Sequence, residues 1–283
     1  MKFLDGLDND LKMALLAQLR DLWTYSSTAL EGNTLTLGET AFILAQGLTV
    51  SGKPLKDHQE VVGHAQAIEL IYGLLDHHDL ISEDDLFLLH RAVQASIVID
   101  IYQPIGAWKR EPNGTQALTA DGKQTFIDYA APADVPVLMK EWLTILNSAL
   151  SHPLNESDAL SAYTDLHQAF VRIHPFADGN GRMARLVANL PVLNSGFPPI
   201  LIDQTRRRDY LQWLSVYDLQ VGCARTNREL LPKSELRNEF KLFCKDCWQA
   251  SLDLVTEMHI RQQARRDSCS LIEEISHGQT STQ

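Results

Sequence analysis

The sequence is organised around one stretch, His174-Pro175-Phe176-Ala177-Asp178-Gly179-Asn180-Gly181-Arg182-Met183-Ala184-Arg185. Its twelve residues bring together a histidine, an aspartate, two glycines and two arginines. Apolar residues upstream recur at near-helical spacing and predict an amphipathic helix from about Ser157 to Ile173, which Pro175 ends. A second helix is predicted from Arg182 to the segment Gly196-Phe197-Pro198-Pro199. Because glycines permit backbone angles closed to other residues, the stretch is predicted to be a loop that leads into a helix N-terminus.

This loop has the composition of a phosphate-binding site. A helix N-terminus offers unpaired N–H groups and a partial positive charge, and glycines beside it, here Gly179 and Gly181, let a phosphate approach closely. Arg182 and Arg185 are three residues apart, so they lie on one side of the predicted helix and could bond to further phosphate oxygens. Asp178 offers hard oxygen ligands of the kind that Mg²⁺ takes beside substrate phosphates.

Two further side chains complete a set that suffices to transfer a phosphate-containing group. Asn180 can donate its amide to a phosphate oxygen, and His174 titrates near neutrality, so it can take a proton from an attacking hydroxyl. Each residue alone also has a simpler interpretation: a structural histidine, an Asp-Gly-Asn-Gly turn, a solvated arginine pair, and Phe176 as an apolar anchor of the loop. The joint spacing favours the functional interpretation.

The pattern His-x-Phe-x-Asp-Gly-Asn-Gly-Arg-x-x-Arg resembles the signature of Fic-domain proteins over its full length. The resemblance implies an all-α, Fic-type helical bundle with a small β-hairpin flap. It also implies a protein adenylyltransferase that uses ATP and Mg²⁺ to transfer AMP to a Tyr, Ser or Thr hydroxyl of a target protein, which can be the enzyme itself. Relatives often form homodimers through helical surfaces, so a homodimer is open for this chain.

The resemblance assigns roles by position. His174 is the implied base, Asp178 the implied Mg²⁺ ligand, and Asn180 with the backbone from Gly179 to Gly181 the implied α-phosphate site. Arg182 and Arg185 would hold the β- and γ-phosphates. Related toxin kinases carry Lys in place of Gly181, so this glycine favours AMP transfer over phosphorylation.

Glu31 is unusual because it follows a helix predicted from about Asp8 to Leu30, and an acid at a helix C-terminus opposes the macrodipole. This predicts a cationic partner. The segment Ser27-x-x-x-Glu31-Gly32 resembles the inhibitory motif of self-restrained Fic proteins, which implies that Glu31 pairs with Arg185 and misplaces ATP. The simpler alternative is an exposed acid near a turn.

Residues from about Gly106 to Ala131 differ from the helical remainder. Asp121-Gly122 between two short segments predicts a β-hairpin, which resembles the family's flap at about 115–128. Such a flap holds a target segment by strand addition, whereas the simpler alternative is a decorative surface hairpin. Arg207-x-x-Tyr210 resembles the family segment beside the nucleotide base, where Tyr210 would stack, although Leu211 replaces a second Tyr that is frequent there.

Other elements are interpreted as scaffold. Thr36-x-x-Glu39 predicts a capping box for a helix to about Gln46, another helix is predicted from about Lys56 to Leu75, and one begins at Ser82. A helix from about Glu235 and a further one from about Leu252 are predicted near the end. The resulting division is an N-terminal helical region (1–80), a Fic catalytic core (81–248), and a C-terminal extension with a polar tail (249–283). The following histidines are interpreted as core or surface residues: His64, His90 and His167.

Composition limits the class of protein. The chain has 283 residues, of which 45% are hydrophobic, and a formal charge of −11, which argues against nucleic acid as a main partner. No apolar run is long enough to span a membrane and no signal peptide is recognised, so a cytoplasmic protein is expected. Four cysteines are therefore expected to be free thiols, and Cys244-x-x-Cys247 lacks the partner pair that a zinc site needs.

The sequence leaves two other functions open. Glu31 could orient a water that removes AMP from a modified side chain, which makes the protein a de-AMPylating phosphodiesterase. Alternatively, the chain could be a nucleotide-responsive binding module with vestigial chemistry. Intact polar and charged residues at all such signature positions argue against the binding module.

Overall fold

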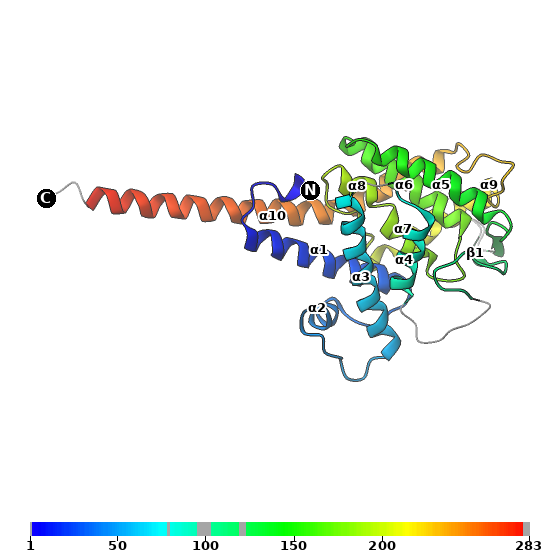
Figure 1. Ribbon diagram of the computed structural model, residues 1–283, viewed down its shortest axis with the longest axis horizontal. Coiled ribbons are helices and arrows are strands. Elements are labelled where there is room, and N and C mark those ends of the chain that lie inside the picture. The colour runs from blue at the N-terminus through cyan, green and yellow to red at the C-terminus, as the bar shows by residue number, and fades with distance from the viewer. Residues whose placement is uncertain (1, 78–79, 95–102, 119–122, 280–283) are drawn as a thin grey trace.

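The computed structural model describes residues 2–77, 80–94, 103–118 and 123–279. Its regular structure is helical apart from one two-stranded sheet, which confirms the predicted all-α fold with a small hairpin (Figure 1). The α-helices and strands are α1 (Asn9–Leu30), α2 (Leu37–Gln46), α3 (Leu55–His77), α4 (Glu83–Val93), β1 (Gly114–Leu118), β2 (Gln124–Asp128), α5 (Val135–Leu150), α6 (Glu156–Ile173), α7 (Asn180–Val187), α8 (Leu190–Asn194), α9 (Arg207–Val221) and α10 (Glu235–Gln279).

Helix starts follow the predicted capping chemistry. Thr36 and Glu39 form a reciprocal capping box at α2, and Ser82 with Asp85 forms another at α4. Each box satisfies N–H groups that have no intrahelical partner. The helices predicted from Asp8, Lys56, Ser82 and Ser157 are therefore present, within one or two residues of the expected bounds.

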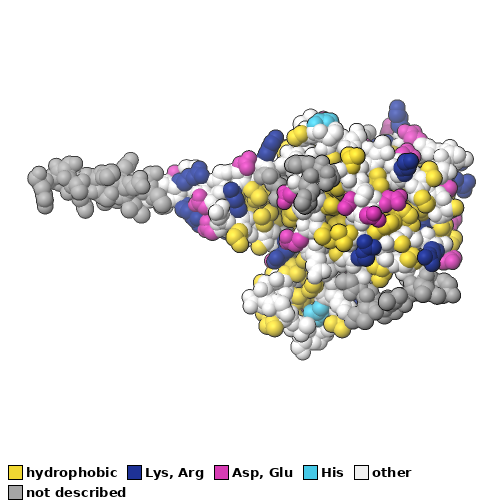
Figure 2. Space-filling view, in the orientation of Figure 1, with side chains coloured by type: hydrophobic (Ala, Val, Ile, Leu, Met, Phe, Trp, Pro, Cys, Tyr) yellow, Lys and Arg dark blue, Asp and Glu magenta, His cyan; other side chains and the backbone are white. Residues whose placement is uncertain are grey.

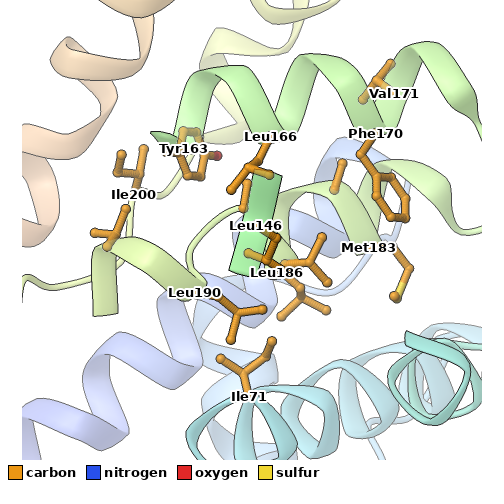
Figure 3. Close-up of a cluster of buried hydrophobic side chains, with 14 of the residues drawn as sticks. Ile71, Leu146, Tyr163, Leu166, Phe170, Val171, Met183, Leu186, Leu190 and Ile200 are labelled. Atoms are coloured by element: carbon orange, nitrogen blue, oxygen red, sulfur yellow. The ribbon is translucent and has the colours of Figure 1, made fainter. Parts of the chain in front are cut away.

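Helix α6 lies at the centre of the bundle and packs against α5, α7, α8 and α10. Figure 3 shows Leu166 and Phe170 of this helix on the side that faces the α7 side chains. Fully burying a Leu or Phe side chain stabilises a fold by roughly 1.5–3 kcal/mol. This core therefore fixes the two helices that flank the signature loop, with the following buried residues labelled in the figure: Ile71, Leu146, Tyr163, Leu166, Phe170, Val171, Met183, Leu186, Leu190 and Ile200.

The prediction of one helix from Arg182 to the Gly196 segment was wrong. Helix α7 ends at Val187 and α8 begins at Leu190, with Pro191 in the first turn of α8. Proline has no N–H to continue the hydrogen bonding of α7. The side chain of Asn189 occupies the break, where its amide donates to Arg185 O at 2.9 Å.

The prediction of two helices after Glu235 was also wrong, because α10 is one helix from Glu235 to Gln279. No proline or glycine interrupts the chain between Glu235 and His277. Its first part packs on α6 and α9, and Arg265 further along pairs with Asp10 of α1 at 2.8 Å. Figure 1 shows its far end running away from the other helices. The expected domain boundary at 248/249 therefore falls inside a helix.

The hairpin is antiparallel, with Thr115 opposite Ile127 and Ala117 opposite Thr125. The predicted turn at Asp121-Gly122 lies outside the described residues. A backbone bond from Tyr129 N–H to Asn113 O at 3.2 Å extends the pairing beyond the strands.

The surface carries charges of both signs. On the face in Figure 2, Lys and Arg side chains are interspersed with Asp and Glu. Within the described ranges, the helices include none with the length and apolar character needed to cross a membrane. Cys244 and Cys247 are buried free thiols of α10, and Cys223 is half-buried.

Candidate active site

His174 follows the last residue of α6 in a left-handed conformation, with φ 51°. Among the described residues it has the one positive φ outside glycine, a backbone strain of about 1–3 kcal/mol that surrounding structure must support. Its Nδ1 lies 3.1 Å from Val171 O, so the proton is assigned to Nδ1 and Nε2 is left as an acceptor. Burial lowers the pKa of His174 to about 4. The imidazole is therefore neutral at pH 7 and able to accept a proton.

The loop after His174 is held from inside by Phe176 and Asn180. Phe176 is fully buried and stacks on the ring of His90 at 3.8 Å between centroids, which confirms it as an anchor. His90 in turn lies with Nε2 3.0 Å from Asp178 O. Asn180 accepts from Phe176 N–H at 2.9 Å and donates to Phe176 O at 2.8 Å. One N–H of the Asn180 amide is thus bonded to the loop, while the residue also lines the cavity, and its expected bond to a phosphate oxygen stays a prediction.

Helix α7 begins at Asn180, within the signature stretch. Gly179 precedes it with φ 75°, and a Cβ there would meet the side chain of Gln94 at 2.8 Å. The first N–H groups of a helix have no intrahelical partner. A Cβ at Gly181 would overlap Oε1 of Glu31, so the glycine is what lets this carboxylate approach the first turn of α7. The site therefore already holds an anionic group where an anion is favoured.

Arg185 is the most heavily bonded side chain of the site, and its side chain is only 3% exposed. Its Nη2 donates to Glu31 Oε1 at 2.7 Å and to Ser27 O at 2.8 Å, while Nε donates to Ser27 Oγ at 3.1 Å. The cationic partner expected for Glu31 is therefore Arg185. Ser27 contributes both a hydroxyl and a carbonyl to the same guanidinium.

Glu31 stays ionised in this position. Burial opposes its ionisation, but the charge and hydrogen bond of Arg185 outweigh that effect and lower the pKa of the carboxyl. Its side chain remains 40% exposed and lines the cavity beside Gly181. The carboxylate thus contacts Arg185 on one side and solvent on the other.

Arg182 is engaged by an acid that sequence analysis did not single out. Its Nη1 lies 3.6 Å from Glu60 Oε1, and its Nη2 lies 3.9 Å from Asp178 Oδ2. Glu60 belongs to α3 and also accepts from the Asn33 amide at 3.0 Å. Both signature arginines therefore face a carboxylate from the N-terminal helices. Nothing in the sequence spacing links α3 to α7, so only the packing could identify Glu60.

Tyr210 lies next to Arg185, and its expected stacking on a nucleotide base stays a prediction. Its ring is 2% exposed, and its hydroxyl accepts from Arg185 Nη1 at 3.2 Å and contacts His167 Nε2 at 3.0 Å. The structure gives Tyr210 the role of holding Arg185 from behind.

These groups surround one cavity of about 410 Å³. It lies between the hairpin, α7 and α9, with His174, Asp178 and the two arginines in its wall. The hairpin contributes Gly114, Thr115, Gln116, Ile127 and, just after β2, Tyr129. A larger hollow of about 570 Å³ lies between α6 and the start of α10 and holds none of the signature residues.

Asp178 presents an accessible carboxylate at this cavity, with a side chain 74% exposed. Burial of part of the group opposes ionisation, but bonds from Gln94 and the Gly179 N–H outweigh it and lower the pKa of Asp178. Across the described ranges, no three His, Cys, Asp or Glu side chains gather into a group that could hold a metal ion.

Comparisons with known proteins agree with this geometry. A profile described as the Fic/DOC family matches residues 80–192, which include the signature. Protein adenylyltransferase fic-1 of Caenorhabditis elegans is 32% identical over 200 residues, covering 70% of this chain and 36% of the relative. Protein adenylyltransferase Fic of Aedes aegypti is 29% identical over 255 residues, covering 87% of this chain and 44% of the relative.

Solved structures give the same result. A Fic-domain-containing signalling protein from Bacteroides thetaiotaomicron superposes with a TM-score of 0.72 at 27% identity, covering 90% of this chain and 93% of that one. Fic-1 from C. elegans superposes with a TM-score of 0.69 at 28% identity, covering 92% of this chain and 69% of that one. The fold and the loop thus define a Fic-domain protein. Its Fic domain lies within residues 80–192, and the chain spans roughly two fifths of the length of the two curated relatives.

Proposed function

We propose that this protein transfers AMP from ATP to a hydroxyl side chain of a target protein. The observation that supports this most is the common cavity: a neutral imidazole, an anion-binding helix start and two buried arginines face one space. The names of the relatives, protein adenylyltransferases, point to the same reaction.

The residues suggest how the reaction proceeds. The target hydroxyl gives its proton to Nε2 of His174 while its oxygen attacks the α-phosphorus. The bond from that phosphorus to the oxygen bridging to the β-phosphate breaks, and pyrophosphate leaves. The N–H groups at the start of α7 stabilise the charge on the α-phosphate, and Arg182 and Arg185 hold the departing phosphates.

Asp178 fits the role of a Mg²⁺ ligand. It is ionised and accessible, and Mg²⁺ usually takes one or two protein carboxylates together with substrate phosphates. When bound, such an ion neutralises phosphate charge and orients the leaving group. The protein's part is to supply the carboxylate beside the helix start.

We also propose that Glu31 restrains the enzyme. Its carboxylate takes the guanidinium that the γ-phosphate needs and lies against Gly181, where phosphate oxygens would approach. ATP can then bind only with its α-phosphate displaced, and a displacement of about 1 Å can cost roughly a hundredfold in rate. In the proposed division of the chain, residues 1–80 carry the inhibitory helix and residues 81–248 form the catalytic core.

The test uses ATP labelled at the α-phosphate. Glu31→Gly should increase the label transferred to the protein itself or to proteins of a host-cell lysate, and His174→Ala on the same background should remove it. Equal labelling by both variants would overturn the proposed reaction. Mass spectrometry of the labelled protein should find AMP on a Tyr, Ser or Thr side chain.

A second candidate is the reverse reaction, hydrolysis of AMP from a modified side chain. The 40% exposure of the Glu31 side chain at the cavity favours it, since the carboxylate could orient an attacking water. In that case Glu31→Gly would abolish the release of AMP from a modified protein instead of raising transfer. A protein that binds ATP in calorimetry but never transfers or releases AMP would instead be a binding module.

A further inference from the structure

Tyr129 covers one face of the His174 imidazole. It follows the last residue of β2, and its ring lies parallel to the histidine ring, with 3.7 Å between centroids and 1° between planes. The hydroxyl of Tyr129 hydrogen-bonds to the side chain of Thr115 on β1. The residue thus connects the hairpin to the histidine at the end of α6.

The hairpin presents one face to the cavity. Thr115 lies opposite Ile127 in the register, and Tyr129 comes two residues later. Alternate residues of a strand share a face, so these three side chains lie together, and all three line the cavity with His174. Tyr129 is therefore the member of this face that reaches the histidine.

The base of the hairpin is fastened to the signature loop by separate contacts. Lys109 N–H donates to Pro175 O at 2.8 Å, and the Asn113 amide donates to Phe176 O at 3.0 Å. The Nζ of Lys109 also donates to Asn113 at 2.6 Å. These contacts join the segment before β1 to the loop just after His174, so Tyr129 is not the sole contact that holds the hairpin against the loop.

The His174 ring needs a second restraint besides its hydrogen bond. The contact from Nδ1 to Val171 O fixes one ring atom but leaves the ring free to tilt about that atom. A parallel ring at 3.7 Å removes this tilt, because a tilted imidazole would collide with Tyr129. With both restraints, the direction of Nε2 is fixed.

We propose that Tyr129 is a positioning residue for the base: its ring fixes the plane of the His174 imidazole so that Nε2 faces the acceptor hydroxyl. The proposal rests on the proposed function, since it takes His174 as the base. The Thr115 bond keeps the Tyr129 ring over the histidine, but the ring itself is the restraining group.

The expected effects separate positioning from folding. Stacking between two aromatic rings contributes a free energy that corresponds to roughly a twofold to tenfold change in the population of the stacked arrangement. Tyr129→Leu should therefore lower kcat for AMP transfer by about twofold to tenfold, with the KM for ATP unchanged within twofold. Tyr129→Phe keeps the ring and should retain kcat within twofold of the parent. If Tyr129 had only a structural role, folded Tyr129→Leu and folded Tyr129→Phe would have the same kcat.

The experiment uses the full-length Glu31→Gly protein as parent and measures incorporation of α-phosphate label from ATP into the protein itself. Proton chemical shifts of the His174 ring, followed by NMR with histidine-selective labelling, give a readout that needs no activity. Stacking under an aromatic ring shifts these protons upfield. The upfield shift should be present in the parent and in Tyr129→Phe, and absent in Tyr129→Leu. Thermal unfolding confirms that each variant is folded.

The outcomes are distinct. A Glu31→Gly parent that transfers no label overturns the proposed function. If the parent transfers label and folded Tyr129→Leu has the same kcat as the parent, the positioning role alone is overturned. Equal loss of kcat in Tyr129→Phe and Tyr129→Leu would assign the effect to the hydroxyl and likewise overturn it. Loss in Tyr129→Leu with retention in Tyr129→Phe supports it.

Discussion

Replacing Glu31 by glycine removes the carboxylate that holds Arg185, and we expect AMP transfer to become faster. Arg185 keeps its bonds to Ser27 and Tyr210, so the guanidinium remains in position without Glu31. What changes is its availability, since a triphosphate no longer has to displace an acid. The variant also opens the space beside Gly181.

The size of the effect follows from the environment of the pair. Hydrogen bonds to charged groups contribute roughly 1.5–3 kcal/mol, whereas solvent-exposed ion pairs contribute roughly 0–1 kcal/mol. Arg185 is buried but the Glu31 side chain is 40% exposed, so an intermediate value of about 1–2 kcal/mol applies. This corresponds to about a 5- to 30-fold gain in productively bound ATP.

The assay is the initial rate of label transfer at ATP concentrations below saturation. Glu31→Gln is the matched variant, because it keeps the shape of the side chain but not its charge, and it should give a smaller gain than glycine. Glu257→Gln serves as a control, since Glu257 is an exposed acid that pairs with Arg261 on α10, away from the cavity. A Glu31→Gly rate within twofold of wild type, on a background where His174→Ala abolishes transfer, would refute the inhibitory role.

Acidic pH should not reproduce the effect of this substitution. The folded-state pKa of Glu31 is lowered, so its pairing with Arg185 is present above the unfolded-state pKa and is lost only as pH falls through the folded value. His174, with a pKa of about 4, becomes protonated in the same acidic range and can no longer act as a base. The wild-type rate should therefore not rise between pH 8 and pH 5, and a pH–rate profile that climbs toward pH 5 would contradict this reasoning.

The remaining predictions concern the metal, the second acid and the loop anchor. Asp178→Asn should raise the Mg²⁺ concentration for half-maximal transfer by at least roughly tenfold, measured by Mg²⁺ titration; an unchanged value would exclude Asp178 as a ligand. Glu60→Gln should tighten ATP binding by calorimetry, but less than Glu31→Gly, because Glu60 lies 3.6 Å from Arg182, beyond hydrogen-bond distance. Phe176→Ala should lower the free energy of unfolding by about 3–5 kcal/mol in denaturant titrations, since the ring is fully buried. The matched Phe126→Ala, whose side chain is 59% exposed, should change it by less than about 0.5 kcal/mol.

Local features of the fold were predictable because the interactions behind them join neighbouring residues. Capping boxes such as Thr36–Glu39 connect positions three apart, and helical periodicity marked α6 before any packing was known. Helical periodicity did not predict the helix boundaries correctly where the end of a helix depended on the presence or absence of a single residue. Pro191 divided a predicted helix, and the absence of such a residue after Glu235 merged two predicted helices into α10.

The sequence by itself determined the helices around the signature, the order of its chemical groups, and, through a family resemblance, the pairing of Glu31 with Arg185. Only the tertiary structure decided which of those groups contact one another. Residues 31 and 185 are 154 positions apart, and the contacts of Glu60 with Arg182 and Tyr129 with His174 also join different elements. Such contacts depend on how the bundle buries its apolar faces, and no spacing along the chain encodes them. For the same reason the sequence did not show that Asn180 bonds to Phe176 or that Tyr210 bonds to Arg185. Both residues were predicted to contact a nucleotide.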